Sequence, residues 1–478
     1  MSIEQSLSKS DSSTSVKVEV EQVAPENGSF PGESLFKMCR VFLVAFVPLL
    51  LIHQLGASAQ SDTSYFESTY AGDRDIRYIN CKMGCFGFCE PHARKQPEKW
   101  RAVMSQVPSV MQSLQIAEGN PPWDQGIKGS KQKILAWDKA LNWTKSAMET
   151  TDEQTLREFQ ERYGEEGLGL PGWNYSLLPD EMPLELEVLQ WSCEDNCRYE
   201  CMMHNVRTRL EFPTEQIVHY YGKWPFLRVF GIQEIAPMVA SVANMLPFIN
   251  FFFRRGFSRN AFPWFVGIRL YMLVWAVAWL FSTIFHTRDT KLTEALDYMS
   301  AFGACVNAIC YTIARIWFPS DNIFRQPKLL AIVLPIASAY AYHVYYMNFV
   351  HFDYGYHMIC GAMAGAVSSL LQVARLFVRA SRTKEHAHVK LMELSSWREM
   401  CSMIWTNTEP HVWQAAFAQL WAWPGFIFEA LDFPPIFGVL DSHTCWHLWT
   451  AYGSGQCSQA AWADEEHWLA THATKKDA

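Results

Sequence analysis

The feature that most restricts the fold is a succession of long apolar stretches in the C-terminal half of the chain. A helix needs roughly 20 apolar residues to cross the hydrocarbon core of a bilayer. Seven stretches are candidates, and the sixth, interrupted by Pro424, and the seventh, which carries two histidines, are the weakest. The sequence therefore predicts an all-α polytopic membrane protein, with a seven-transmembrane-helix bundle over 226–453. The stretches lie at about 231–253, 263–285, 294–317, 328–349, 354–377, 411–431 and 434–453.

The composition agrees with this interpretation and excludes one class of partner. Hydrophobic residues make up 49% of the chain, and charged residues make up 18%, below the ~25% of soluble domains. The formal net charge is −8, and no Lys/Arg stripe with interleaved aromatic residues is present. A nucleic acid is therefore not expected as a partner.

The N-terminal region has the pattern of a secretory signal behind a long leader. Residues 1–35 lack periodic apolar positions and are predicted to be disordered. The segment 36–59 then combines basic residues, an apolar core at 41–52 and the small-residue sequence Ala57-Ser58-Ala59, the order of a signal peptide. Because the leader is unusually long, an uncleaved signal anchor is the alternative. Either form would send the following segment into the lumen.

Two clusters of cysteines characterise the polar region 60–225, which we interpret as a lumenal domain. Both clusters have the spacing C-x3-C-x3-C. Secretory compartments oxidise thiols, so three disulfides linking the clusters are expected, with the pairing left open. A metal site is the alternative, although the C-x2-C spacing is absent. The six cysteines are Cys81, Cys85, Cys89, Cys193, Cys197 and Cys201, and Asn142 and Asn174 begin glycosylation acceptor sequences.

Basic residues in the short loops predict the orientation. They follow the first, third and fifth predicted helices and are scarce in the intervening loops. The basic loops are therefore expected in the cytosol, together with a tail at 454–478. The chain ends Lys475-Lys476-Asp477-Ala478, which resembles the dilysine signal by which coat machinery returns proteins to the endoplasmic reticulum. We expect a multi-pass protein of the endoplasmic reticulum membrane, with the Golgi as the alternative.

Five polar side chains are predicted at similar depth near the lumenal side of the bundle. His443 and His447 are four residues apart and so share a helix face. Ser282 and His286 have the same spacing at the end of the second predicted helix, and Asp297 lies one turn into the third. One polar residue in a bilayer is usually a structural hydrogen-bonding group. Five at one level predict a functional site.

Three imidazoles with one open position are a recurring ligand set for catalytic Zn²⁺. His286, His443 and His447 are the predicted ligands, and Asp297 is the predicted base that takes a proton from water. Ser282 is expected to donate a hydrogen bond to a developing oxyanion or to orient a histidine. It lacks the G-x-S-x-G context of a serine nucleophile. Asp441 is either a second-shell partner of a ligand or a helix N-cap.

The order Ser-x3-His, Asp and His-x3-His resembles the CREST superfamily of seven-helix metal hydrolases. Within it, the sequence is most similar to the GPI-anchor lipid-remodelling family known as post-GPI attachment to proteins factor three. The resemblance covers roughly 70–90 and 190–450. It is carried by Gly222-Lys223-Trp224-Pro225-Phe226, Gly231-Ile232-Gln233-Glu234, Ser282 to Asp289, Thr293-Glu294 with Asp297-Tyr298, Phe352 to Tyr356, Leu431 to Pro435, and Asp441 to His447.

This resemblance implies removal of the sn-2 fatty acid from the phosphatidylinositol of GPI-anchored proteins, at the lumenal face of the membrane. It also implies that His286, His443 and His447 bind the metal, with Asp297 and Ser282 beside them. GPI-anchored proteins and their lipid would be the substrate. The alternatives are a ceramidase-like amidase and a receptor or chaperone for GPI-anchored proteins with a structural metal. A transporter ranks last because no interrupted helix pair repeats across two halves.

Overall fold

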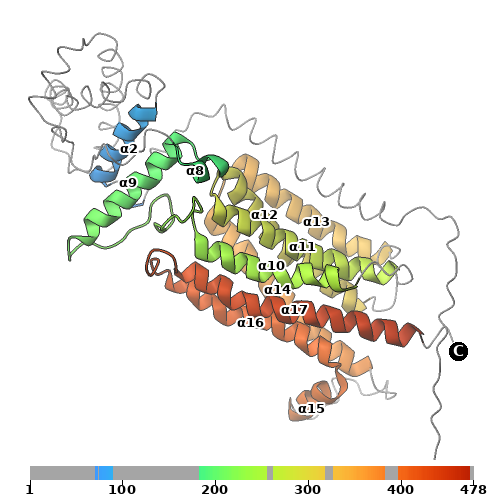
Figure 1. Cartoon of the computed structure of the whole chain (residues 1–478). Helices are drawn as coiled ribbons and strands as arrows, with labels where there is room; N and C mark the ends of the chain where they lie inside the picture. The colour runs from blue at the N-terminus through green and yellow to red at the C-terminus, as the bar shows by residue number, and fades with distance from the viewer. Residues whose placement is uncertain are drawn as a thin grey trace, which may run out of the picture. The chain divides into compact units, whose positions relative to one another are not determined.

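The computed structural model describes residues 70–73, 75–89, 182–255, 262–317, 327–382 and 397–473. In these ranges the regular structure is helical, with isolated β-bridges only at turns (Figure 1). The predicted all-α class is confirmed. The leader, the signal segment, both glycosylation acceptors and the terminal dilysine lie outside the described residues.

The two cysteine clusters lie on α2 (Ile76–Cys89) and α9 (Cys193–Leu210), with the short helix α8 (Leu184–Val188) before α9. Residues four apart share one helix face, so each cluster forms a row of three thiols. Two rows that meet in antiparallel fashion pair the first member of one with the last of the other. The disulfides are Cys81–Cys201, Cys85–Cys197 and Cys89–Cys193, which confirms three bridges between the clusters.

Helices occupy all seven regions where spans were predicted. Four of them are long and apolar enough to cross a membrane by length and composition, and α10 contributes a shorter apolar segment, Ile235–Phe251. A membrane protein is therefore confirmed, and seven crossings stay a prediction. The helices are α10 (Ile235–Arg255), α11 (Phe262–Thr287), α12 (Lys291–Trp317), α13 (Pro327–Tyr345) continuing as the π-helix η5 (Tyr346–Val350), α14 (Tyr354–Arg382), α16 (Pro410–Leu431) and α17 (Ser442–Ala473). A further helix, α15 (Trp397–Asn407), precedes α16.

Six of these helices pack in a closed ring. Helix α10 contacts α11, α11 contacts α12, α12 contacts α14, α14 contacts α16, α16 contacts α17, and α17 returns to α10. Helix α13 packs on α12 from outside this ring, and the helices run alongside one another in Figure 1. The ring therefore surrounds an interior into which side chains from all six helices can point.

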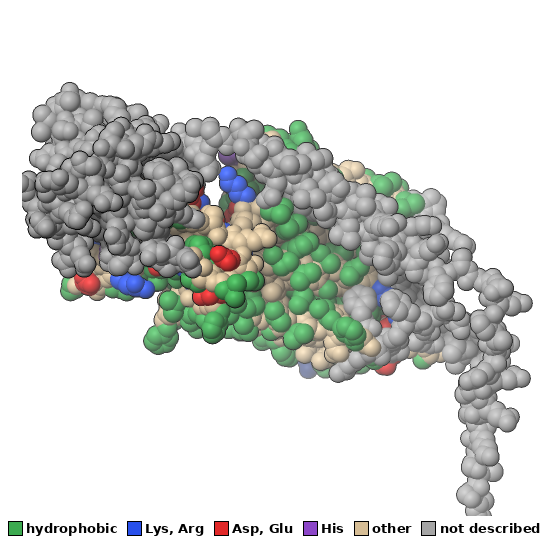
Figure 2. Space-filling model, turned by 45° about the horizontal axis from the view of Figure 1, so that its top comes forward, with side chains coloured by type: hydrophobic (Ala, Val, Ile, Leu, Met, Phe, Trp, Pro, Cys, Tyr) green, Lys and Arg blue, Asp and Glu red, His purple; other side chains and the backbone are tan. Residues whose placement is uncertain are grey.

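Helix α14 shows how the sequence distinguishes the interior from the lipid side. Ile359, Met363, Val367 and Leu370 are exposed, and their spacing places them on one face. Polar Gln372 lies on another face and is buried. Figure 2 shows the outer surface of the described helices covered largely by hydrophobic side chains. A bundle that turns apolar side chains outward and polar ones inward is suited to a bilayer.

The C-terminal part of the bundle corrects two boundaries of the sequence prediction. The seventh helix does not begin at 434, because Pro434 and Pro435 lie in a turn closed by a bridge between Ile436 and Leu440, and α17 starts at Ser442. The helix then continues to Ala473. The segment predicted as a cytosolic tail is therefore mostly part of α17, where it contributes buried side chains to the bundle.

Helix α16 continues through Pro424, so this proline does not end the sixth helix. Gly425 lets α16 and α17 approach closely, because a Cβ there would lie 2.6 Å from Cδ1 of Trp449. One turn away, the rings of Trp421 and Trp449 stack at 4.4 Å, and each indole donates a hydrogen bond to the other residue's carbonyl oxygen. These contacts hold the helix that carries the histidine pair.

Candidate active site

The three predicted histidines meet inside the ring of helices. His286 lies in the last turn of α11, and His443 and His447 lie in the first two turns of α17. One ring nitrogen from each lies within 4.8 Å of those of the other two. The rings of His286 and His447 are buried, and Nε2 of His443 lies 2.8 Å from Nε2 of His447. The structure thus brings together three imidazoles that are up to 161 positions apart in the sequence.

Glu234 holds His286 through both its backbone and its side chain. Its amide donates a 3.0 Å hydrogen bond to the carbonyl oxygen of His286 at the end of α11. Its carboxylate lies 2.6 Å from Nδ1 of the same histidine. A carboxylate can only accept, so Nδ1 carries a proton, and in the neutral ring Nε2 then has a free lone pair. That Nε2 is buried and has no hydrogen-bond partner among the described residues.

The other two histidines are oriented in the same way. Nδ1 of His443 lies 2.6 Å from the carboxylate of Glu429 on α16. Nδ1 of His447 lies 3.3 Å from the hydroxyl oxygen of Ser241 on α10. That hydroxyl donates to the carbonyl oxygen of Pro237, which leaves its own oxygen to accept from the histidine. Each ring therefore has its Nδ1 at an acceptor, which leaves its Nε2 as the nitrogen available to a ligand.

This arrangement fits a metal ion. Two unprotonated Nε2 atoms 2.8 Å apart repel each other unless a cation or a proton lies between them. Zinc binds imidazole nitrogen at about 2.0–2.1 Å, and histidine ligands of metals almost always donate their other N–H to a carboxylate, carbonyl or water. Glu234 and Glu429 are such carboxylates. The donor set therefore fits Zn²⁺ better than a purely structural polar cluster.

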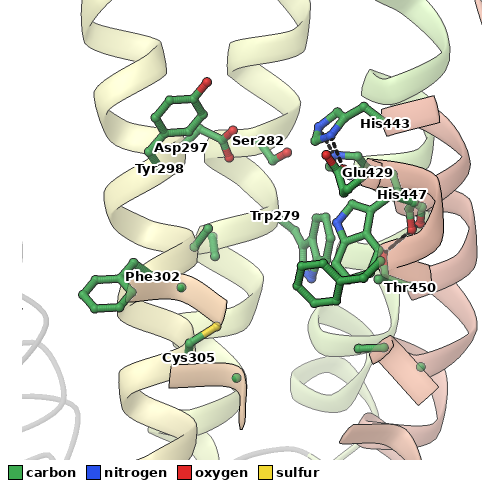
Figure 3. A pocket seen from close by; sticks show the side chains of 18 of the residues that line it. Trp279, Ser282, Asp297, Tyr298, Phe302, Cys305, Glu429, His443, His447 and Thr450 are labelled. Carbon is green, nitrogen blue, oxygen red and sulfur yellow. Dashed lines mark hydrogen bonds and ion pairs between the residues drawn. The ribbon is translucent and has the colours of Figure 1, made fainter. Parts of the chain in front are cut away.

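Asp297 and Ser282 lie beside the histidines, as the sequence predicted. Figure 3 shows Asp297 on α12 pointing toward Ser282 on α11, across the cavity from His443 and His447. Ser282 Oγ also lies 3.1 Å from the hydroxyl oxygen of Ser241. All these side chains except Ser241 line one cavity of about 780 Å³ inside the bundle. A carboxylate, a hydroxyl and three imidazoles thus face a shared space.

Asp441 does not contact a histidine through any described hydrogen bond. Its carboxylate accepts from the backbone amide of Thr444 at 2.7 Å and from the hydroxyl of Thr444 at 2.6 Å. Because α17 begins at Ser442, this is the geometry of an N-cap. The side chains that contact Nδ1 of the three histidines are those of Glu234, Glu429 and Ser241. A carboxylate within an apolar stretch was the signal that could have identified Glu429.

The mouth of the cavity is polar and aromatic. Lys223 lines it, and its ammonium pairs with Asp289 and lies 3.8 Å from Glu294. Burial alone would lower the pKa of Lys223, but these carboxylates outweigh burial and raise the pKa. Arg228 is not at the mouth, because it bonds Glu200 at 2.9 Å and stacks on Trp191. Of Lys223 and Arg228, only Lys223 lines the cavity.

The helices and this site define a class of protein: an all-helical membrane protein with a three-histidine site inside its bundle. A family model described as the Per1-like family matches residues 183–455. The chain belongs to this family, which confirms the resemblance drawn from its motifs. The match includes the three histidines of the site and the residues that orient them, whereas α2 with the first cysteine cluster lies outside it.

Individual proteins that are similar to this chain agree with the family assignment. The chain is 32% identical over 273 residues to the GPI-specific phospholipase A2-like PGAP3 of Bos taurus, covering 56% of this chain and 74% of that one. It is 31% identical over 274 residues to the protein of the same name from Homo sapiens, with the same coverage. It is also 31% identical over 288 residues to the PER1 homolog of Schizosaccharomyces pombe, again covering 56% and 74%. No solved structure matches the chain.

Proposed function

We propose that this protein is a metal-dependent phospholipase that hydrolyses the sn-2 acyl ester of the phosphatidylinositol of GPI-anchored proteins. The observation that carries the proposal is the convergence of three imidazoles beside Asp297 and Ser282, at a cavity inside a membrane bundle. The names of the relatives, GPI-specific phospholipase A2-like, support the choice of lipid. The lumenal face and the endoplasmic reticulum membrane, with retrieval by coat machinery, are part of the proposal.

His286, His443 and His447 would hold the metal, and Glu234, Glu429 and Ser241 would keep their rings in the ligating orientation. A bound zinc ion supplies a Lewis acid and lowers the pKa of water at the site toward ~7. No fourth histidine, cysteine or carboxylate is grouped with these three among the described residues, so an ion held by them would leave room for water or the ester carbonyl.

Asp297 would act as the general base and then as the general acid. Water supplies the oxygen that bonds to the acyl carbon, and its proton passes to the carboxylate of Asp297. The glycerol oxygen at sn-2 leaves with the electrons of the broken C–O bond and takes that proton. The products are a free fatty acid and a lysolipid. Ser282 would hold the Asp297 side chain in place or donate to the developing oxyanion.

The cavity suits a lipid substrate because its walls are largely apolar below the histidines. Trp275, Trp279, Phe302 and Phe426 line it. An acyl chain placed there would be removed from water with the ester group at the histidines. The polar head group would stay at the mouth, near Lys223 and Trp224. Excluding water from the chain also strengthens the electrostatic contacts at the ester.

The test is the lipid composition of GPI-anchored proteins in cells that lack this protein. Complementation with the wild type should restore the deacylated or remodelled phosphatidylinositol, measured by mass spectrometry. Complementation with His443→Ala or Asp297→Asn should leave the original diacyl form in place. His351→Ala, in the exposed turn before α14, is the matched control and should behave as the wild type.

Two other outcomes would replace the proposal. If Asp297→Asn restores the remodelled lipid while His443→Ala does not, the metal is structural and the protein acts as a receptor or chaperone. If the GPI lipid is unchanged in all lines while ceramide accumulates in the null cells, the enzyme is an amidase. Equal restoration by every variant would exclude the histidine site from GPI processing.

A further inference from the structure

The cavity extends far beyond the histidines, toward the other end of the bundle. Its lining includes Gln372 and Arg375 of α14, His411 of α16 and Asp464 of α17. Asp464 lies 17 positions after His447 on the same helix, so the two are separated by about 25 Å along the axis. One leaflet of a bilayer has a hydrocarbon depth of roughly 15 Å. The cavity is therefore deep enough to take a long acyl chain in an extended form.

A buried polar group closes the deep end. Asp464 pairs with Arg315, lies 3.4 Å from a guanidinium nitrogen of Arg375 and lies 3.3 Å from Nε2 of His411. All four side chains are buried. Gln372 lies beside them and donates a 3.1 Å hydrogen bond to Thr312. We call Gln372, Arg375, His411 and Asp464, which line this end, the floor of the cavity; Arg315 pairs with Asp464 but does not line the cavity.

The floor is a physical stop for an apolar chain. Asp464 pairs with the basic side chains around it. Separating them to admit a methyl group would leave a buried charge without its partner, which costs free energy. Each methylene group, by contrast, is stabilised when it lies against the apolar wall, because it is then removed from water. A chain should therefore extend down the cavity until it reaches the floor and no further.

The wall above the floor is formed partly by residues with small side chains. On α14, Gly361 and Gly365 line the cavity together with Ala362. A Cβ at Gly361 would meet no atom within 4 Å, and one at Gly365 would meet only Trp423, at 3.9 Å. The missing side chains thus leave space in the cavity that no other part of the described protein fills. Larger residues there would shorten the space below the histidines.

We infer that the protein prefers substrates with a long-chain fatty acyl group. The distance between the histidines and the floor sets the length of acyl chain that fits. The inference rests on the proposed function, because it places the ester at the histidines and the chain below them. Gln372 and the two glycines are then specificity-determining residues: Gln372 limits the depth, and Gly361 and Gly365 keep the path open.

The experiment compares Gly365→Leu and Gln372→Ala with the wild type, as purified full-length proteins. Diacyl GPI lipids carrying decanoyl, palmitoyl or arachidoyl chains at sn-2 are offered in equal amounts, and the released fatty acids are counted by mass spectrometry. Gly365→Leu should shift release toward decanoate, by roughly tenfold for every two methylenes displaced. Gln372→Ala should shift it toward arachidate. Gly455→Leu is the control, because this α17 glycine has open space around its Cβ but does not line the cavity.

An unchanged chain-length profile in both folded variants would overturn the inference, as would equal losses for all chain lengths in Gly365→Leu. Binding of radiolabelled decanoate, palmitate and arachidate to the same proteins gives a second readout that needs no catalysis. If the wild type releases no fatty acid, the proposed function fails, yet the binding profile still decides the length selection. A shift in that profile for Gly365→Leu but not for Gly455→Leu supports the inference.

Discussion

The disulfide ladder between α2 and α9 and the histidine site are both built from side chains spaced four residues apart on helices, but they are held differently. In the ladder, three covalent bonds join two helices that contain all the participating residues. In the histidine site, two helices supply the three imidazoles, and separate elements supply the acceptors that orient them. The ladder needs only the contact of two helices, whereas the site forms only when the ring of helices closes.

The largest effect is expected from replacing one of the three proposed metal ligands. His286→Ala should remove the bound zinc and abolish fatty-acid release, because two imidazoles leave the ion with too few protein ligands. Elemental analysis of the purified protein should fall from about one zinc per chain to none. His351→Ala should keep both zinc and activity. Zinc that survives His286→Ala would show that this residue is not a ligand.

Removing one disulfide of the ladder should have the next largest effect, and this effect should be on stability. Replacing Cys85 and Cys197 together by serine should cost about 2–5 kcal/mol of the stability of the region built on α2 and α9. Limited proteolysis and thermal unfolding of the purified protein would measure the loss, with the exposed free Cys401→Ser as the control. The zinc content should be unchanged. A parallel loss of zinc would mean that the two regions do not fold independently.

A smaller effect is expected from the residues that orient the ligands. Glu429→Gln keeps an acceptor near His443 but removes the charge that favours its N–H, so zinc affinity should fall about 10–100-fold. Competition with a chelator would measure this shift. Glu466→Gln, at an exposed position of α17, should not change the affinity. An unaltered affinity in Glu429→Gln would show that the carboxylate contributes only packing.

The smallest effect distinguishes the two roles considered for Asp441. As an N-cap of α17, it should tolerate Asn, whereas Asp441→Ala should cost about 1 kcal/mol of stability. Thermal unfolding would measure the difference between the two variants, and both should bind zinc as tightly as the wild type. A drop in zinc affinity for Asp441→Asn would restore the second-shell role.

The sequence predicted features that residue spacing within one helix reveals. It did not predict contacts that form only when the helices pack into the closed bundle. The cysteine rows, the three histidines and Asp297 could be singled out from the sequence because their spacing or their polarity within apolar stretches marks them. The pairing Cys81–Cys201 needed the antiparallel contact of two helices. Glu429 lies on the sixth predicted helix, and only the packing of α16 on α17 shows which imidazole it meets.

The boundaries that were wrong have similar causes. The seventh helix was placed from hydropathy, which does not detect the capping of α17 by Asp441 or the turn at Ile436. The segment after 453 looked polar enough to be a tail, yet Asp464 is buried because Arg315 and Arg375 of other helices surround it. Buried polar groups are compensated by partners that no single stretch of sequence contains.

The most direct test of the central claim is hydrolysis by the purified, zinc-loaded protein in water enriched in heavy oxygen. Diacyl GPI lipid is the substrate, and the products are weighed by mass spectrometry. We predict one heavy oxygen in the carboxyl group of the released fatty acid and none in the lysolipid, with both products lost on zinc removal and regained on its return. Fatty-acid release that is unaffected by zinc removal, or no release at all, would contradict the account.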